Sequence, residues 1–356
     1  MEHMSIDLDP KSGVHRLTVG PAKSDKEIIY GTEAWLKKLR QELYLVGPTE
    51  AKVIITGETG TGKTKLARAI HLCHPERAAR TFRRTNVGAL VPELAASQLF
   101  GHVKGAFTNA VADHTGVVEQ SYGGTFFMDE VAAAADSVQV MLLTLLETKK
   151  INKVGADFNQ AKDSNARFIA ATTVPINALR DSKSFRKDLF FRISEYHIAI
   201  PPLRDWPQEI PQLAQHFLVE CQDKYRTIRF QEKEYAALQE IEDAAIERLQ
   251  RYQWPGNVRE LQSVIHTAVV RSREDPKETI LRASHLPSLA DPEFSASRIS
   301  NFDDYPTWKD AKEAFHREWM EWALRRCGTA AEVGHRFRVD QKTIRKYRGE
   351  PRSKQR

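Results

Sequence analysis

The amino-acid sequence predicts an α/β protein built on a parallel sheet, followed by a helical region and by a small all-α domain at the carboxyl end. Three observations lead to this prediction. A short apolar strand, a glycine-rich loop and a helix follow one another in residues 53–70. A second apolar strand, in residues 123–130, ends in two carboxylates. A short pair of helices rich in basic residues occupies residues 328–347.

The glycine-rich loop has the complete pattern of a phosphate-binding loop. Residues 53–55 are β-branched and apolar, as a buried parallel strand should be, and residues 66–70 favour a helix. In such a loop backbone N–H groups point at the phosphates, the lysine reaches the terminal phosphates and the hydroxyl residue ligates magnesium. The sequence therefore predicts binding of ATP and Mg²⁺, with Thr64 as a metal ligand, by Gly57, Glu58, Thr59, Gly60, Thr61, Gly62, Lys63 and Thr64.

The two carboxylates at the end of the second strand are Asp129 and Glu130. A buried strand end that holds two acids is costly unless a cation or a proton transfer uses them. Beside a phosphate-binding loop, we assign Asp129 to the magnesium shell and Glu130 to polarising the attacking water. This pair predicts ATP hydrolysis in addition to ATP binding.

From about residue 28 to residue 290 the sequence resembles the AAA+ ATPase domain of the bacterial enhancer-binding proteins, which activate σ54 RNA polymerase. Residues 100–110, Phe-Gly-His-Val-Lys-Gly-Ala-Phe-Thr-Asn-Ala, are similar to the σ54-contacting loop of that family. The resemblance makes Phe107 and Thr108 the contact residues. Asn109 stands where the family has glycine, and asparagine tolerates left-handed backbone angles better than other residues with side chains.

The same resemblance implies five further site residues. In that family an asparagine restrains the catalytic glutamate, a polar residue ends the sensor strand, two arginines reach the neighbouring subunit's nucleotide, and a lid arginine senses the γ-phosphate. A guanidinium supplied by a neighbour implies an assembled homo-oligomer, which in this family is usually a hexameric ring. In this sequence the corresponding residues are, in the same order, Asn86, Thr173, Arg186, Arg192 and Arg259.

The carboxyl end predicts a DNA-binding module. Residues 328–347 have the length and order of a helix-turn-helix, and they resemble the Fis-type module of many such activators. Seven Lys and Arg residues crowd residues 342–356, and such a surface attracts phosphates through counterion release. A solvated basic tail without sequence specificity is the alternative. We assign base contacts to Gln341, Lys342 and Arg345. We assign contacts with the DNA backbone to Lys346 and Arg348.

The composition agrees with this organisation. The chain has 356 residues, a net charge of +6 and three widely spaced cysteines, which argue against a disulfide scaffold or a cysteine metal cluster. This cysteine pattern favours the reduced cytoplasm, and no apolar run approaches the roughly 20 residues that span a bilayer. We expect a short, polar and irregular N-terminal segment, an AAA+ core, a helical lid, a linker and a helix-turn-helix domain at 1–28, 29–203, 204–283, 284–306 and 307–356.

These predictions favour an ATP-hydrolysing, DNA-binding activator that remodels the σ54 RNA polymerase holoenzyme at enhancer-type DNA. Because residues 1–28 are too few for a sensory domain, regulation would come from a separate protein. Two alternatives stay open. One is a DNA-binding regulator that no longer acts on σ54 and uses ATP for assembly only. The other is an AAA+ ATPase that remodels a different protein.

Overall fold

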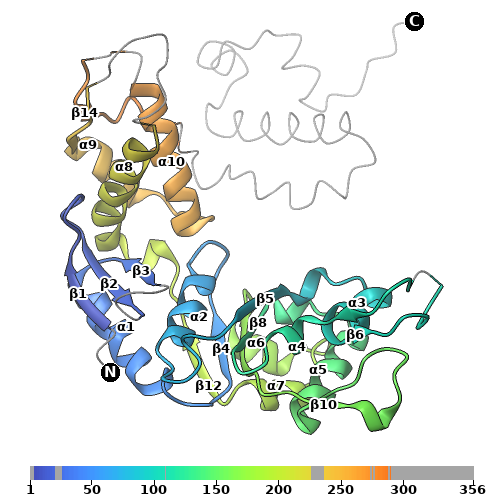
Figure 1. Ribbon diagram of the computed structural model, residues 1–356. Coiled ribbons are helices and arrows are strands. Elements are labelled where there is room, and N and C mark those ends of the chain that lie inside the picture. Colours follow the sequence, from blue (N-terminus) through green and yellow to red (C-terminus); the bar gives the residue numbers. More distant parts are fainter. Residues whose placement is uncertain are drawn as a thin grey trace, which may run out of the picture. The chain divides into compact units, whose positions relative to one another are not determined.

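The computed structural model describes residues 4–20, 26–108, 110–225, 236–272, 275, 277–287 and 289 (Figure 1). The helices and strands within these ranges belong to one compact unit formed by residues 1–287. The predicted helix-turn-helix domain and most of the predicted linker lie outside the described residues. No helix in the described ranges combines the length and the apolar character needed to cross a membrane.

A five-stranded sheet forms the centre of the unit, as predicted. The strand order is β12-β4-β11-β8-β5, and every neighbouring pair is parallel. β4, β8 and β11 are buried along their whole length, which explains their nearly continuous apolar sequences. The five strands are β4 (Val53–Thr56), β5 (Phe82–Asn86), β8 (Thr125–Asp129), β11 (Arg167–Thr172) and β12 (Tyr196–Ala199).

Successive residues of the inner strands enter different hydrophobic clusters, because side chains alternate between the two faces of a sheet. Phe126 and Met128 of β8 pack in one cluster with residues of α3, α5, α6 and α7. Phe127 packs in the other cluster, with residues of α1 and α2. The helices that cover the sheet are α1 (Glu33–Val46), α2 (Lys63–Leu72), α3 (Pro92–Phe100), α4 (Val117–Gln120), α5 (Asp136–Thr148), α6 (Ile176–Asp181) and α7 (Lys187–Ile193).

The N-terminal segment is not irregular, and our expectation for it was wrong. It forms an antiparallel sheet in the order β1-β2-β3, whose first two strands precede residue 28. In β2, Leu17 and Val19 are fully buried in the cluster that contains α1, while their neighbours are more exposed. This alternation is the mark of a half-buried strand. The strands are β1 (Met4–Leu8), β2 (His15–Val19) and β3 (Glu27–Tyr30).

Two short antiparallel pairs carry the loops that leave the central sheet. The first pair, β6 (Gly101–His102) and β7 (His114–Thr115), brackets the predicted σ54-contacting loop. The second pair is β9 (Lys150–Ile151) and β10 (Lys162–Asp163). The loop between the second pair touches the first, because Val103 N–H donates to Val154 O and Val154 N–H donates to Gly101 O.

A helical lid follows the sheet domain, as predicted. α8 packs against α10 and α9, and a short parallel pair, β13 with β14, closes the lid. Its elements are α8 (Ile210–Tyr225), β13 (Glu240–Ile241), α9 (Asp243–Arg251), α10 (Asn257–Ser272) and β14 (Ile280–Leu281). Single 3₁₀ turns occur at η1 (Val87–Ala89), η2 (Val131–Ala133), η3 (Phe158–Gln160), η4 (Leu203–Asp205) and η5 (Pro207–Glu209).

Candidate nucleotide-binding site

The phosphate-binding loop joins β4 to α2 with the geometry that the sequence predicted. Gly60 and Gly62 have φ angles of +82° and +101°, a conformation that residues with side chains rarely adopt. A Cβ atom on Gly60 would lie 2.1 Å from Gly256 O of the lid, so the close approach also requires glycine. Thr61 Oγ1 donates to Glu58 O at 2.8 Å and stabilises the turn.

Lys63 begins α2, and its ammonium group lies against the loop. Its Nζ donates to Gly57 O at 2.7 Å and to Glu58 O at 3.1 Å. Burial lowers the pKa of Lys63, and the negative charges of Glu130 and Asp129 oppose that shift. A cation held at the mouth of a loop and at a helix N-terminus makes a site for an anion.

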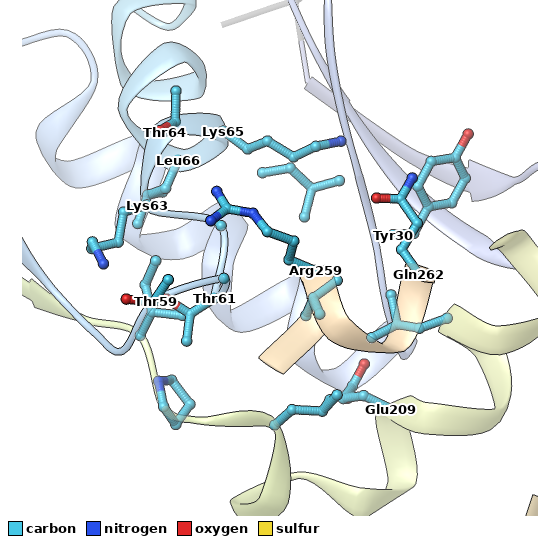
Figure 2. A pocket seen from close by; sticks show the side chains of 18 of the residues that line it. Tyr30, Thr59, Thr61, Lys63, Thr64, Lys65, Leu66, Glu209, Arg259 and Gln262 are labelled. Atoms are coloured by element: carbon cyan, nitrogen blue, oxygen red, sulfur yellow. The ribbon is translucent and has the colours of Figure 1, made fainter. Parts of the chain in front are cut away.

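A cavity of about 570 Å³ brings the loop, the acid pair and the lid together. In Figure 2 the Arg259 side chain from α10 extends towards Lys63 and Thr64 at the start of α2. The predicted site residues that line the cavity are Thr59, Gly60, Thr61, Gly62, Lys63, Thr64, Asn86, Asp129, Glu130 and Arg259. The predicted site residues that do not line it are Gly57, Glu58, Thr173, Arg186 and Arg192.

The acid pair sits at the carboxyl end of β8. Asp129 is 6% exposed, and its Oδ1 accepts the Glu130 N–H at 3.2 Å. Glu130 has a φ of 52°, which is uncommon outside glycine and recurs at functional sites. Thr173, just after β11, donates from Oγ1 to Glu130 Oε2 at 3.5 Å, so the predicted sensor residue does reach the predicted catalytic carboxylate.

Asn86 ends β5, directly beside Asp129 in the strand register. Its Oδ1 accepts the Ala89 N–H at 3.2 Å and so caps the turn η1. Within the described ranges, no hydrogen bond joins Asn86 to Glu130. The predicted restraint of Glu130 by Asn86 therefore stays a prediction, although both side chains line the same cavity.

Oxygen ligands of the kind that Mg²⁺ prefers meet beside the phosphate-binding loop. The Thr64 hydroxyl and the Asp129 carboxylate both line the cavity. The cavity also contains the Lys63 ammonium and the Arg259 guanidinium, which suit the phosphates of a nucleotide. The residues present therefore fit a magnesium nucleotide.

One part of the cavity wall is apolar. It includes Ile29, Trp35, Leu213 and Phe217, and Figure 2 shows Tyr30 on the opposite side of Arg259 from Lys63. The ring of Tyr30 stacks on that of His216 with centroids 3.5 Å apart. A wall of this kind suits a planar, weakly polar base.

Three residues at the site were missed by the sequence analysis. Arg84 of β5 lines the cavity and forms an ion pair with Asp129, with Nη2 2.6 Å from Oδ2. Arg204 of η4 holds Glu58 through two hydrogen bonds of 2.8 and 2.6 Å. Asn257 of α10 donates to Thr59 O at 3.0 Å. Only Asn257 had a signal in the sequence, because it lies two residues before Arg259, the lid residue that the resemblance implied.

The two predicted arginine fingers lie on the surface. Arg186 precedes α7 and pairs with Asp188 at 2.7 Å, and Arg192 is in the last turn of α7 and lies 3.4 Å from Glu147. Both side chains are almost half exposed. Neither lines the cavity of its own chain, so their predicted action on a neighbouring subunit's nucleotide stays a prediction.

The predicted σ54-contacting loop projects between β6 and β7. Gly105 N–H donates to Ala110 O at 2.8 Å, and Gly105 has a φ of +82°. Phe107 is 40% exposed, and its ring lies 4.9 Å from the ring of His102. Thr108 is exposed, whereas Asn109 and the predicted DNA-contacting residues lie outside the described residues.

Together, a parallel sheet in this strand order, a phosphate-binding loop, a strand-end acid pair and a helical lid define an ATPase-type domain of the AAA+ class. Comparison with known families agrees, because residues 29–199 match the Sigma-54 interaction domain and residues 204–298 match the AAA+ ATPase lid domain. The match to the Sigma-54 interaction domain covers the sheet domain, and the match to the AAA+ lid covers the helices that follow it.

Similar curated proteins are transcription regulators. The chain is 38% identical over 247 residues to the DNA-binding transcriptional activator HyfR of Escherichia coli K12, covering 69% of this chain and 35% of HyfR. It is 36% identical over 300 residues to the anaerobic nitric oxide reductase transcription regulator NorR of Escherichia coli 55989, covering 83% of this chain and 56% of NorR. The chain therefore spans only about a third of HyfR and just over half of NorR.

A solved structure has the same fold. NtrX from Brucella abortus in complex with ADP superposes with a TM-score of 0.65 at 25% identity, covering 91% of this chain and 68% of NtrX. The structure of NtrX in complex with ATP gives a TM-score of 0.62 at the same identity, covering 90% of this chain and 68% of NtrX.

Proposed function

We propose that this protein is an ATP-hydrolysing, DNA-binding transcription activator that remodels the σ54 RNA polymerase holoenzyme. The observation that supports this most strongly is the single cavity in which the phosphate-binding loop, the acid pair and Arg259 meet. The cavity belongs to a chain whose Sigma-54 interaction domain also exposes Phe107 on a projecting loop.

The residues of the cavity suit hydrolysis of ATP, and the similar NtrX was solved with ADP and with ATP. Lys63 and Arg259 would hold the phosphates, and Thr64 and Asp129 would hold Mg²⁺, which neutralises charge on the phosphate oxygens when bound. Glu130 would take a proton from a water whose oxygen attacks the γ-phosphorus. The bond to the β–γ bridging oxygen breaks, giving ADP and phosphate, and Thr173 positions the Glu130 carboxylate.

Arg186 and Arg192 would complete the site of a neighbouring subunit. Their side chains do not line their own cavity, and the acids with which they pair are almost half exposed, so separating these pairs costs little. A guanidinium supplied in this way stabilises charge on the transferred phosphoryl group. ATP hydrolysis would then require a closed homo-oligomer, for which we propose a hexameric ring.

The projecting loop would contact σ54 through Phe107 and Thr108, and ATP hydrolysis would move these two residues against σ54. Asn86 ends β5, next to the strand that carries the acid pair. It would couple the conformation of the Glu130 carboxylate to that of the segment that follows β5. The carboxyl-terminal helix-turn-helix would hold the ring at enhancer-type DNA in the cytoplasm. Its proposed contacts are Gln341, Lys342, Arg345, Lys346 and Arg348.

Asn109 favours a second candidate, a DNA-binding regulator of the same ancestry that assembles with ATP but does not act on σ54. It occupies the loop position where the resembling family has glycine. A remodelling ATPase with another protein target is a third candidate. Both alternatives keep the ATP site, so the assay that separates them from the activator must measure promoter opening.

The experiment is open-complex formation by the purified σ54 holoenzyme on a supercoiled promoter template with hydrolysable ATP. The proposal predicts opening with the wild-type protein and none with Glu130→Gln. Opening is also expected to fail with a hydrolysis-resistant ATP analogue. Measurable ATP turnover without any promoter opening would overturn the proposed function and favour the regulator that does not act on σ54.

A further inference from the structure

Arg84 is hydrogen-bonded to the side chain of Asp129, the carboxylate that we assign to magnesium. Its Nη2 donates to Asp129 Oδ2 at 2.6 Å, and its Nε donates to the same oxygen at 3.2 Å. The other oxygen, Oδ1, accepts the Glu130 N–H at 3.2 Å. Both oxygens of Asp129 are therefore engaged within the protein, in a side chain that is only 9% exposed.

The strand register places Arg84 at this position. β5 and β8 are parallel neighbours in which Asn86 pairs with Asp129. Side chains alternate along a strand, so Arg84 shares a face with Asn86 while Arg83 faces the other way. In agreement, Arg84 and Asn86 line the cavity and Arg83 does not.

A carboxylate that is nearly buried is costly without a positive partner, and Arg84 supplies that partner. A metal ion at Asp129 would meet the positive charge of Arg84 at short range, where like charges repel strongly in a site of low dielectric constant. The Arg84 side chain is half exposed, so it can leave towards solvent while Asp129 cannot. The two cations are therefore alternative partners of one carboxylate.

We propose that Arg84 competes with Mg²⁺ for Asp129 and so gates the loading of the metal nucleotide. This inference rests on the proposed ATP site. Without metal, Arg84 neutralises Asp129 and lets the phosphates approach an acid pair that would otherwise repel them. When the metal nucleotide enters, Arg84 gives up Asp129 and turns towards solvent.

The proposal predicts effects of opposite sign when Arg84 is replaced. In Arg84→Ala, Asp129 keeps an unopposed negative charge, so the nucleotide without metal binds about tenfold more weakly. The magnesium nucleotide binds about tenfold more tightly, because no charged hydrogen bond has to be broken first. A merely structural role for Arg84 predicts weaker binding in both conditions.

The test is binding of a fluorescent, hydrolysis-resistant ATP analogue to the full-length protein, measured by anisotropy with excess Mg²⁺ and again with EDTA. Arg84→Gln serves as a second variant that keeps most of the side-chain volume. Arg84→Lys keeps the charge and is expected to retain wild-type binding in EDTA. Arg83→Ala removes an exposed neighbour that does not line the cavity, and should change neither dissociation constant.

The expected result is that the dissociation constant in EDTA, divided by the dissociation constant in excess Mg²⁺, rises about a hundredfold in Arg84→Ala and in Arg84→Gln. Equal changes in both conditions, or no change in either, would overturn the competition between Arg84 and Mg²⁺. A wild-type protein that binds the analogue no better than Lys63→Ala in either condition would instead overturn the proposed ATP site. The two failures are therefore distinguishable.

Discussion

Asn257 of the lid donates a hydrogen bond from Nδ2 to the carbonyl oxygen of Thr59 in the phosphate-binding loop, at 3.0 Å. The same nitrogen lies 3.2 Å from Glu58 Oε2, and Asn257 Oδ1 accepts the Leu203 N–H at 2.8 Å. Asn257 is fully buried and has a φ of 52°. One side chain thus joins the lid, the connection before the lid and the loop, so a movement of the lid away from the loop has to break these hydrogen bonds.

Replacement of Asn257 should loosen this joint in two separable ways. Asn257→Gly keeps the left-handed backbone but leaves the buried Leu203 N–H without its acceptor, which should cost about 1–3 kcal/mol of unfolding free energy. Asn257→Ala should cost about 1–2 kcal/mol more, because its Cβ is strained at this φ. Urea unfolding measures both values. Equal stabilities for wild type and both variants would contradict the role of this joint.

Glu130→Gln should keep ATP bound but stop turnover. The amide has nearly the same shape as the carboxylate but cannot accept the proton of the attacking water, so kcat should fall by about 10²–10⁴. Thr173 can still donate to the remaining carbonyl oxygen, so nucleotide affinity should stay close to that of the wild type. Steady-state phosphate release and analogue binding measure the two quantities. Normal turnover in Glu130→Gln would show that another group accepts the proton.

Arg192→Ala should lose ATP hydrolysis without losing the fold, because the Arg192 side chain is almost half exposed and its ion pair with Glu147 is long, at 3.4 Å. Mixing Arg192→Ala with Glu130→Gln should restore part of the activity. In mixed rings an intact Glu130 of one subunit meets an intact Arg192 of its neighbour. Phosphate release across mixing ratios measures this rescue, and no rescue at any ratio would contradict a site shared between subunits.

Acidification should destabilise the compact unit through histidines whose pKa values are lowered in the folded chain. Burial lowers the pKa of His216 below its ordinary value of 6.5, while Glu220 and Asp9 act against that shift. Below about pH 6.5 the unfolded chain therefore binds more protons than the folded chain, and stability falls as the pH falls. Burial lowers the pKa values of His74 and His197 in the same way.

His216→Phe isolates the contribution of His216, because phenylalanine keeps a ring against Tyr30 but cannot take up a proton. The unfolding free energy of this variant, measured from about pH 7.5 to 5.5, should fall less steeply than that of the wild type. Equal slopes for the two proteins would show that His216 does not titrate differently on folding.

Much of the fold could be predicted from local sequence. Consecutive residues alone identify the apolar strands β4 and β8 and the glycine-rich loop before Lys63, without knowledge of distant contacts. The N-terminal strands were missed because β2 buries only Leu17 and Val19 among polar neighbours. In so short an alternating segment, sequence alone does not distinguish a strand on the sheet domain from an irregular tail.

The missed parts of the site depend on contacts between distant segments. Arg84 meets Asp129 only because β5 lies beside β8, and the two residues are 45 positions apart. Asn257 and Glu58 are 199 positions apart and meet only after the lid has folded onto the loop. A motif identifies residues that chemistry requires at a fixed spacing. It does not identify partners that strand order or lid placement supplies.

The most direct test of the central claim is whether the purified protein forms a stable complex with isolated σ54 when ADP and aluminium fluoride mimic the hydrolytic transition state. We expect gel filtration to show a complex with the wild type and none with Phe107→Ala. The variant should keep its ATPase activity, because Phe107 does not line the cavity. A wild-type protein that hydrolyses ATP but forms no complex with σ54 would contradict the proposed action on σ54.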